Sequence, residues 1–256
     1  MKKIVVLFTA GIALLSLAAP ARAQVIVKDT FQEATNPPDN PQNLEMAGAK
    51  PSPVNLPGAT WQLATGDGTY ESYLTPPATT AAACFHNVAS VGLSLAGNGA
   101  YVKPSVLTVS ADSAFAGDSA TGVCLLGFYS ALTGPHTANP VANFTGLELQ
   151  KNGALQLIEN GVPSATAISY TGTYDPTKPV TLSYTIDTGK GTISNISLSG
   201  STSTYSFTSK AFTNAATAFL GIGGQTDGTS MSYFTNLQLS SGAGTPAQAP
   251  SPAKTP

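Results

Sequence analysis

Apolar and polar residues alternate with a period of two along much of the chain. In GLELQKNGALQLIENG (146–161), leucine occupies alternate positions on both sides of Asn152-Gly153. Successive side chains of a β-strand point to opposite faces of a sheet, so this alternation predicts half-buried strands. Asn-Gly suits a two-residue type I′ turn. The segment therefore predicts a β-hairpin.

A second hairpin is predicted in 180–198. Leu182, Tyr184 and Ile186 alternate with polar residues, and DTGKG (187–191) is a glycine-containing hairpin loop. The apolar positions change phase between Ile193 and Ile196, which indicates a β-bulge in the returning strand.

Similar signals recur from end to end, bounded by Gly, Pro, Asn and Asp. No segment has a helical period with caps; KAFTNAATA (210–218) allows a turn or two. About thirteen strands are predicted near 24–31, 59–64, 80–89, 100–110, 122–130, 145–151, 154–159, 164–170, 179–187, 191–199, 203–208, 216–222 and 231–240. Many strands without alternating helices predict two packed antiparallel sheets.

The two ends of the chain differ from the rest. A basic start, an apolar run over 4–19 and Ala21-Arg22-Ala23 predict a signal peptide at 1–23 that is cleaved before Gln24. An uncleaved anchor is the alternative, but the run is short for a span of about 20 residues. The proline-rich segment 242–256 predicts a disordered tail. The expected organisation is one β-sandwich over 24–241, located outside the cell or in the periplasm or cell envelope.

Charge excludes several classes of partner. Without the leader the chain keeps 8 lysines against 13 acidic residues, a net charge of −5, and no arginine. A nucleic-acid-binding protein needs clustered cations to neutralise phosphates, whereas these lysines are scattered singly. We therefore expect neither nucleic acid nor an anionic membrane surface as a partner, and no membrane span in the mature chain.

The two cysteines, Cys84 and Cys124, leave two interpretations open. An exported chain permits a disulfide, and closing a loop of about 40 residues stabilises by roughly 4 kcal/mol in the chain-entropy model. Alternatively, both are buried thiols that act as small apolar side chains, since both lie in apolar runs. The disulfide is the prediction carried forward.

Several segments resemble one known group of proteins. VIVKDTF (25–31), GATWQL (58–63), the two hairpin regions above and the closing AFLGIGG…MSYFTNLQLS are similar to secreted bacterial proteins of the concanavalin A-like lectin/glucanase jelly-roll type. The resemblance implies an all-β, two-sheet antiparallel jelly-roll sandwich. It also implies that the opening Asp-x-Phe strand pairs with the closing aromatic-x-Asn-Leu strand.

Enzymatic activity has little support in the sequence. Retaining glycoside hydrolases need two carboxylates roughly 5 Å apart, and the Glu-x-Asp-x-Glu strand of the laminarinase-like enzymes has no counterpart here. Glu148 stands between Gly146 and Gln150. Polysaccharide lyases generally use Arg, Lys, His or Tyr, but His86 and His136 are isolated and each is more typical of a structural residue. No catalytic residue is predicted.

Metal binding is likewise weakly indicated. Asp29, Asp67 and Asp227 could offer oxygen ligands to calcium, but none belongs to a dense Asp-x-Asp-x-Asp loop. Asp-Gly in the latter two is typical of a turn. We expect no cofactor, and structural calcium is not supported.

Aromatic residues are the remaining candidates for a site. Trp61, Tyr70 and Tyr73 lie close together in the sequence and are predicted to stack against a sugar ring, with Tyr101 and Tyr129 as further candidates. Core packing is the alternative for Trp61 and Tyr70, and it is favoured for both. The expected function is a non-enzymatic, lectin-like module that binds a polysaccharide or cell-surface glycan. A structural or adhesive envelope protein is the alternative, and a glycoside hydrolase or lyase with an unrecognised site comes third.

Overall fold

The computed structural model of the protein describes most of the residues between 23 and 242. The predicted signal peptide (1–23) and tail (242–256) lie outside the described residues except for Ala23 and Gly242. The described residues are 23–31, 44–46, 48–51, 56, 58–65, 69–75, 78–86, 88–96, 103–116, 121–133, 141–170, 174–175, 178–198, 201–202, 207–208, 212–226 and 231–242.

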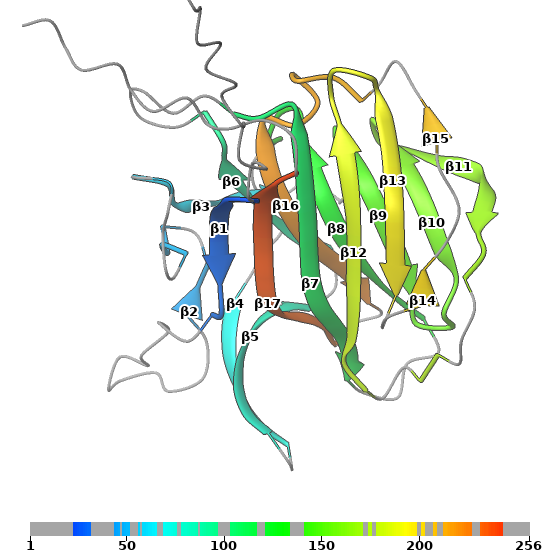
Figure 1. Ribbon diagram of the computed structural model, residues 1–256. Helices are drawn as coiled ribbons and strands as arrows, with labels where there is room; N and C mark the ends of the chain where they lie inside the picture. The colour runs from blue at the N-terminus through cyan, green and yellow to red at the C-terminus, as the bar shows by residue number, and fades with distance from the viewer. Residues whose placement is uncertain are drawn as a thin grey trace, which may run out of the picture.

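Two antiparallel sheets pack face to face (Figure 1). The ten-stranded sheet has the order β14-β13-β12-β7-β17-β5-β4-β2, with β1 also paired to β17 and β15 to β13. Its strands are β1 (Val25–Asp29), β2 (Leu44–Glu45), β4 (Thr69–Thr75), β5 (Ala78–His86), β7 (Val106–Ala116), β12 (Val180–Asp187), β13 (Thr192–Leu198), β14 (Ser201–Thr202), β15 (Phe207–Thr208) and β17 (Met231–Ser241).

The seven-stranded sheet has the order β11-β10-β9-β8-β16-β6-β3. Its strands are β3 (Trp61–Thr65), β6 (Val88–Ser94), β8 (Gly122–Tyr129), β9 (Phe144–Gln150), β10 (Leu155–Glu159), β11 (Val162–Ile168) and β16 (Phe219–Thr226). The predicted all-β, two-sheet antiparallel sandwich is confirmed.

The main core fills the space between the sheets. Inward residues alternate with outward ones, as in β12, where Leu182, Tyr184 and Ile186 are buried and their neighbours are partly or fully exposed. Tyr184 reaches from the ten-stranded sheet to the other, where its hydroxyl donates to Leu126 O at 3.1 Å. This hydrogen bond satisfies a buried polar group and ties the two sheets together.

The two predicted hairpins are confirmed. Leu149 pairs with Leu155, Gln150 N donates to Ala154 O at 2.8 Å and Gly153 N donates to Gln150 O at 2.8 Å, so the loop of the first hairpin spans the three residues 151–153. The predicted two-residue type I′ turn at Asn152-Gly153 is therefore wrong: Gly153 has a φ of 89°, but Asn152 does not have the positive φ that this turn requires. In the β12–β13 hairpin the register shifts between Ser183 and Thr185, and the extra residues of β13 include Asn195 with a φ of 53°. The predicted bulge is therefore present, and a left-handed asparagine forms part of it.

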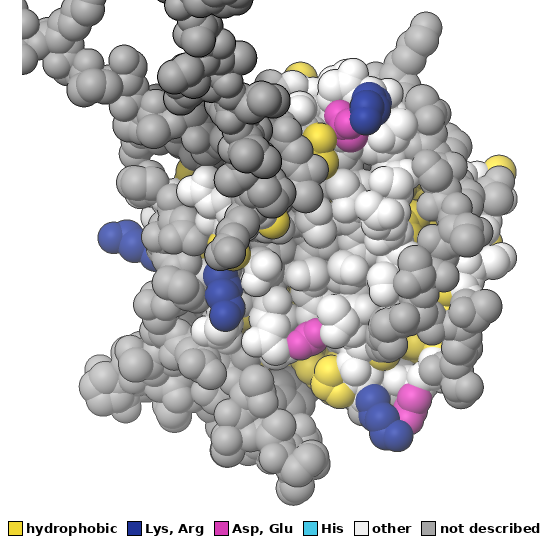
Figure 2. Space-filling view, in the orientation of Figure 1, with side chains coloured by type: hydrophobic (Ala, Val, Ile, Leu, Met, Phe, Trp, Pro, Cys, Tyr) yellow, Lys and Arg dark blue, Asp and Glu magenta, His cyan; other side chains and the backbone are white. Residues whose placement is uncertain are grey.

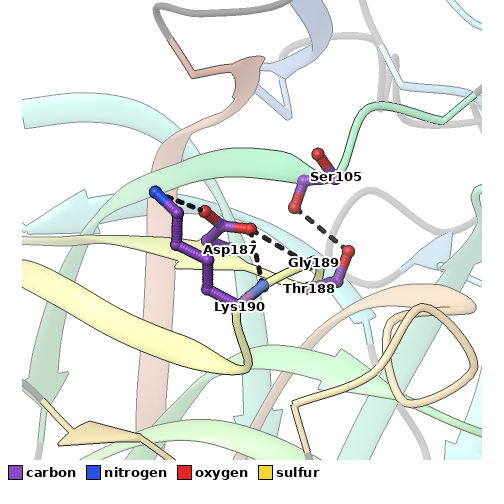
Figure 3. Close-up of polar contacts among 5 residues, drawn as sticks. All are labelled: Ser105, Asp187, Thr188, Gly189 and Lys190. Atoms are coloured by element: carbon purple, nitrogen blue, oxygen red, sulfur yellow. Dashed lines mark hydrogen bonds and ion pairs between the residues drawn. The ribbon is translucent and has the colours of Figure 1, made fainter.

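Side chains fix the loop of the β12–β13 hairpin (Figure 3). Asp187 Oδ1 accepts hydrogen bonds from Gly189 N at 3.0 Å and Lys190 N at 3.1 Å, while Oδ2 lies 3.4 Å from Lys190 Nζ. Thr188 donates its hydroxyl to Ser105 O at 3.1 Å, which ties the loop to the start of β7. The aspartate thus acts as a turn residue.

The first and last strands pair, as the resemblance implied. Asp29 faces Leu237 across the β1–β17 pair. Asp29 is 1% exposed and accepts two hydrogen bonds, from Trp61 Nε1 at 2.9 Å and from Phe31 N at 2.8 Å. The second of these accompanies the left-handed backbone of Phe31, whose φ is 55°. The aspartate therefore joins the first strand of one sheet to β3 of the other.

Several strand boundaries differ from the predictions. The predicted strand 80–89 is divided between β5 and β6, which belong to different sheets. The strand expected at 100–110 begins later and extends to Ala116, and β4 was not predicted at all. Residues 214–217 form a turn in place of a short helix.

The predicted disulfide between Cys84 and Cys124 is not supported, because the two residues form no disulfide in the structure and both thiols are buried. Cys84 belongs to the ten-stranded sheet and lies between Ala83 and Phe85, which face the main core. Alternation turns Cys84 to the opposite face. Cys124 belongs to the other sheet and is itself part of the main core. The structure supports the interpretation as separate buried thiols.

Candidate functional site

Part of the outer face of the seven-stranded sheet is covered by a second, smaller core. Gly92, Gly221, Gly127 and Gly146 stand opposite one another on β6, β16, β8 and β9. Beside this glycine row lies a row of Phe219, Tyr129 and Phe144 on the last three of these strands. The glycines leave room for the rings, since a Cβ on Gly221 would lie 2.4 Å from the Tyr129 ring.

The segment after β8 closes over these rings. A Cβ on Gly92 would lie 2.6 Å from the Leu132 side chain, and Thr133 donates its hydroxyl to Ala64 O on β3 at 2.9 Å. Tyr129 and Phe144 pack edge-to-face with ring centroids 5.1 Å apart, and neither ring is more than 1% exposed. Tyr129, a predicted stacking candidate, is therefore a core residue, whereas Phe219 in the same row is partly buried.

The open part of the same face carries a polar strip, defined here as Glu148, Gln150 and Gln156. Each alternates with buried leucines of the main core, so all three point outward. Glu148 lies directly opposite Gln156, and Gln150 Nε2 donates to Glu148 Oε1 at 3.0 Å. Gln156 Nε2 donates to Ser164 O on β11 at 2.6 Å. The bonds hold two amides and one carboxylate in fixed positions across three strands.

A pocket of about 150 Å³ adjoins the polar strip. Its wall combines the beginning of β8 with the end of β9 and the following turn: Thr121, Gly122, Val123, Gln150, Lys151 and Asn152. Lys151 N donates to Gly122 O at 2.8 Å, which holds the two sides together. The residues of the wall thus carry hydroxyl, amide and ammonium groups together with one apolar side chain, that of Val123.

Two tyrosines support the turn that borders this pocket. Tyr170 donates its hydroxyl to Gly153 O at 2.6 Å, and a Cβ on Gly153 would lie 2.9 Å from the Tyr174 ring. Both rings also pack against the main core, and burial raises the pKa of each hydroxyl above its ordinary value. The Asn152 side chain accepts from Ala154 N at 2.9 Å. The turn is thus rigidly placed.

The chemistry of this region is hydrogen bonding. Glu148 is the carboxylate of the strip, and Glu159 on β10 falls on the opposite face by alternation from Gln156. Among the described residues no second carboxylate shares this face with Glu148, so the paired acids of a glycoside hydrolase are not assembled there. Amide and carboxylate groups fixed on a sheet suit recognition of hydroxyls.

Trp61 does not lie on a surface. Its ring is 0% exposed, donates to Asp29 and stands 6.5 Å from the Phe31 ring between centroids. A sugar cannot reach a ring in that position, so Trp61 is a core residue, the alternative that the sequence favoured. Tyr70 and Tyr73 lie on β4, in the other sheet from Trp61, and their side chains are outside the described residues. Stacking by these two tyrosines stays a prediction.

The other predicted candidates fall outside the described part or have structural roles. Tyr101, His136, Asp67 and Asp227 lie outside it, as does the side chain of His86. Asp29, considered for calcium, is engaged by Trp61. Within the described ranges no group of three or more His, Cys, Asp or Glu side chains is arranged to hold a metal ion. Nor does the described part contain a helix long and apolar enough to cross a bilayer.

The polar strip, which was not predicted, has a signal in the sequence: the alternation of polar residues with leucines in the first hairpin. Placing the leucines of both strands on one face pairs Leu149 with Leu155 across a three-residue loop, and this register makes Glu148 and Gln156 cross-strand neighbours on the polar face. Their partner Gln150 follows from the period of two.

The outer face of the ten-stranded sheet is a second polar surface. Thr108, Thr185 and Ser194 form one cross-strand row, and Ser110, Ser183 and Ser197 form another. We call these six residues the hydroxyl face. Figure 2 shows this side of the molecule, where side chains that are neither charged nor apolar cover the middle of the sheet. Asp112, the acid on β7 beside it, accepts from Thr181 Oγ1 at 2.5 Å and Asn236 Nδ2 at 2.7 Å.

Lys103 is the one strongly perturbed cation of the described chain. Its ammonium donates to Asn214 O at 2.8 Å, Thr217 O at 2.6 Å and Thr217 Oγ1 at 2.7 Å. Burial lowers its pKa to about 8. With three acceptors engaged, Lys103 holds the turn before β16 and is not free to bind a ligand.

Comparisons with known proteins give structural similarity alone. Neither a protein-family model nor a curated protein sequence matches the chain. Among solved structures, lectin II from Ulex europaeus is similar at a TM-score of 0.47 and 8% identity, over 72% of this chain and 93% of that one. The structure of peanut lectin with a 9mer peptide is similar at a TM-score of 0.47 and 12% identity, over 79% of this chain and 98% of that one. The carbohydrate recognition domain of Emp47p is similar at a TM-score of 0.44 and 12% identity, over 86% of this chain and 97% of that one.

Proposed function

We propose that this protein is an exported, non-catalytic module that binds a neutral glycan on the outer face of its seven-stranded sheet. The observation that carries the proposal is the polar strip beside the pocket. Gln150 and Gln156 can each donate and accept, and Glu148 accepts, which matches the mixed donor and acceptor character of sugar hydroxyls. Their mutual bonds hold them in place before a ligand arrives, which lowers the entropic cost of binding.

The charge of the chain supports a neutral ligand. The mature sequence lacks arginine, the residue best suited to bidentate recognition of carboxylate and sulfate-like groups. Among the described residues of the pocket wall, Lys151 is the only one with a charged side chain, and Glu148 is hydrogen-bonded to Gln150. One positive and one negative group give the region little net charge, so a uronic acid polymer would gain little from binding here.

The absence of a carboxylate partner for Glu148 on the described outer face supports binding without cleavage. An acid that bonds to Gln150 and stands opposite Gln156 is well placed to orient a hydroxyl. Glycoside hydrolysis by an acid and a nucleophile or base generally uses two carboxyl groups that flank the scissile bond.

A glycan-array screen of the mature protein tests this proposal. We expect retention on neutral polysaccharides and none on uronate-rich ones. In parallel, the retained polysaccharide is incubated with wild-type protein and with Glu148→Gln. Reducing sugar or unsaturated product released by the wild type and abolished in Glu148→Gln would establish an enzyme and overturn the non-catalytic proposal. A blank array would overturn glycan binding itself.

A second candidate function is adhesion through the hydroxyl face. The observation that favours it is the regular spacing of the two hydroxyl rows, which places uncharged donors and acceptors on neighbouring strands about 4.8 Å apart. A spacer or adhesin needs such a surface and no pocket. Introducing charge there with Ser110→Glu and Ser183→Glu should reduce adhesion to neutral polysaccharide particles, whereas binding through the polar strip would be unaffected.

A further inference from the structure

The pocket beside the polar strip contains an apolar side chain set between two amides. Val123 lies directly opposite Gln150 on β9 and directly opposite Gln225 on β16. Residues paired in this way point to the same face of a sheet, so the three side chains form one row of amide, apolar group and amide on the outer face. Val123 is partly exposed and Gln225 is exposed. The row therefore combines hydrogen-bonding groups with an apolar contact.

The size of the pocket limits what it can hold. Its volume is about 150 Å³, whereas a cleft that encloses a drug-sized ligand usually measures about 300–1,000 Å³. The pocket is thus suited to one substituent of a sugar ring and not to a whole ring. The ring itself can lie over the polar strip, since Gln150 belongs both to the strip and to the pocket wall.

Hydrogen bonds already present give a direction to two amides of the wall. Gln150 Nε2 donates to Glu148 Oε1 at 3.0 Å, which leaves Gln150 Oε1 as an acceptor. Asn152 Oδ1 accepts from Ala154 N at 2.9 Å, which leaves Asn152 Nδ2 as a donor. Together with Val123, the wall offers an acceptor, a donor and an apolar surface to a substituent.

An acetamido group has the matching set of atoms. Its N–H donates, its carbonyl oxygen accepts and its methyl group is apolar. A hydroxymethyl group would instead place a hydroxyl against Val123, where that hydroxyl has no partner. A carboxylate or an ester has no N–H for Gln150 Oε1, which would remain unpaired.

We propose that the pocket receives the acetamido group of an N-acetylated hexosamine. This inference rests on the proposed function and narrows its neutral glycan to one that carries acetamido groups. Gln150 Oε1 accepts from the amide N–H, Asn152 Nδ2 donates to the carbonyl oxygen, and Val123 packs against the methyl group. The acetamido group is uncharged, which agrees with the low net charge of the region.

Titration calorimetry of the mature protein with a chito-oligosaccharide and a cello-oligosaccharide of equal length tests the inference. The two chains share their backbone and linkage and differ in the acetamido group. We expect the chito-oligosaccharide to bind at least about tenfold more tightly, because a site built for hydrogen-bonding groups binds an analogue without them poorly. An O-acetylated cello-oligosaccharide supplies the methyl and carbonyl groups without the N–H and should bind more weakly than the chito-oligosaccharide.

Val123→Thr tests the apolar contact. Threonine keeps the branched shape and strand propensity of valine but replaces a methyl group with a hydroxyl. The preference for the chito-oligosaccharide should fall about fourfold, the loss expected for one buried methyl group, with little change in the affinity for the cello-oligosaccharide. Val106→Thr changes a partly exposed valine of the other sheet and, as the matched control, should keep the full preference.

The outcomes separate this inference from the proposed function. A cello-oligosaccharide that binds as tightly as the chito-oligosaccharide would overturn the acetamido assignment and leave glycan binding standing. An O-acetylated chain that binds as tightly would overturn the role of the N–H, and a Val123→Thr variant with the full preference would overturn the assignment to this pocket. Retention only on neutral glycans without acetamido groups would also refute the inference. Binding of neither chain together with a blank glycan array would refute the proposed function itself.

Discussion

Trp61 is hydrogen-bonded to the buried Asp29, and substitutions of Trp61 test whether it is a core residue or a ligand-binding residue. Trp61→Ala should lower the free energy of unfolding by about 3–5 kcal/mol, because it removes a fully buried ring. Trp61→Phe should cost less, and much of its cost should come from the hydrogen bond lost to the buried Asp29 carboxylate. Denaturant unfolding measures both. A Trp61→Ala variant of normal stability that no longer binds glycan would contradict the core assignment.

The thiols of Cys84 and Cys124 should be present as thiols in protein recovered after export. Both side chains are 0% exposed, and burial raises the pKa of Cys124, so alkylation of the folded chain should be slow. After denaturation without reductant, two alkyl groups should add, as intact mass will show. A mass about 2 Da below that of the fully reduced chain, with no alkylation before reduction, would instead show that Cys84 and Cys124 form a disulfide.

Lys103 should make stability depend on alkaline pH. Its pKa is about 8 in the fold and 10.5 when unperturbed, so between these values the unfolded chain binds more protons. Stability contributed by this group therefore rises as pH increases from about 8 towards 10.5. Unfolding of wild type and Lys103→Met, compared from pH 7 to pH 10, isolates that contribution. If the wild type instead lost stability relative to Lys103→Met over this range, the pKa of Lys103 would be raised. The three oxygens bonded to Nζ would then outweigh the effect of burial.

At the scale of elements, the glycine row can be tested by adding one methyl group. Gly221→Ala places a Cβ 2.4 Å from the Tyr129 ring, which packs against Phe144 and cannot shift freely. Overpacking of this kind should cost about 1–3 kcal/mol. Gly189→Ala in the exposed β12–β13 loop is the matched control and should change stability little. Equal midpoints for the two variants in thermal unfolding would show that the ring is not fixed over the row.

The elements that the sequence predicted best are those with local causes. The Asn152-Gly153 hairpin and the bulge at Asn195 depend on residues a few positions apart, and both are present. The division of 80–89 between two sheets depends on distant partners: β5 pairs with β17, and β6 with β16. Alternation with a period of two predicts which face of a strand is buried, but it does not predict which distant strand lies beside it.

The candidate site could be predicted only in part for a related reason. Aromatic residues were favoured because stacking is a strong signal, but burial decides whether a ring is available, and Trp61 and Tyr129 are enclosed. Gly221, the glycine that makes room for Tyr129, is on the neighbouring strand β16, so the enclosure of this ring is a product of sheet order. The outward direction of the polar strip follows from the alternation, but the pairing of Glu148 with Gln156 depends on a three-residue loop at 151–153, whereas the sequence predicted a two-residue turn.

At the scale of the whole molecule, the two outer faces offer different chemistry. The seven-stranded sheet combines a covered aromatic region with the polar strip and its pocket, whereas the ten-stranded sheet presents the hydroxyl face. Low charge on both faces is consistent with a chain in which 9% of residues are charged. Binding should accordingly depend weakly on salt, because little of it arises from ion pairing.

The central claim is that the glycan binds to the polar strip, and affinity electrophoresis of three alanine variants tests it most directly. Gln150→Ala and Gln156→Ala each remove amide contacts, at about 0.5–1.5 kcal/mol per hydrogen bond, and should weaken retention by a neutral polysaccharide roughly two- to tenfold. Gln238→Ala on β17 changes the same residue type on the opposite sheet and should leave retention unchanged. Equal retention of all three variants, or a loss confined to Gln238→Ala, would contradict the account.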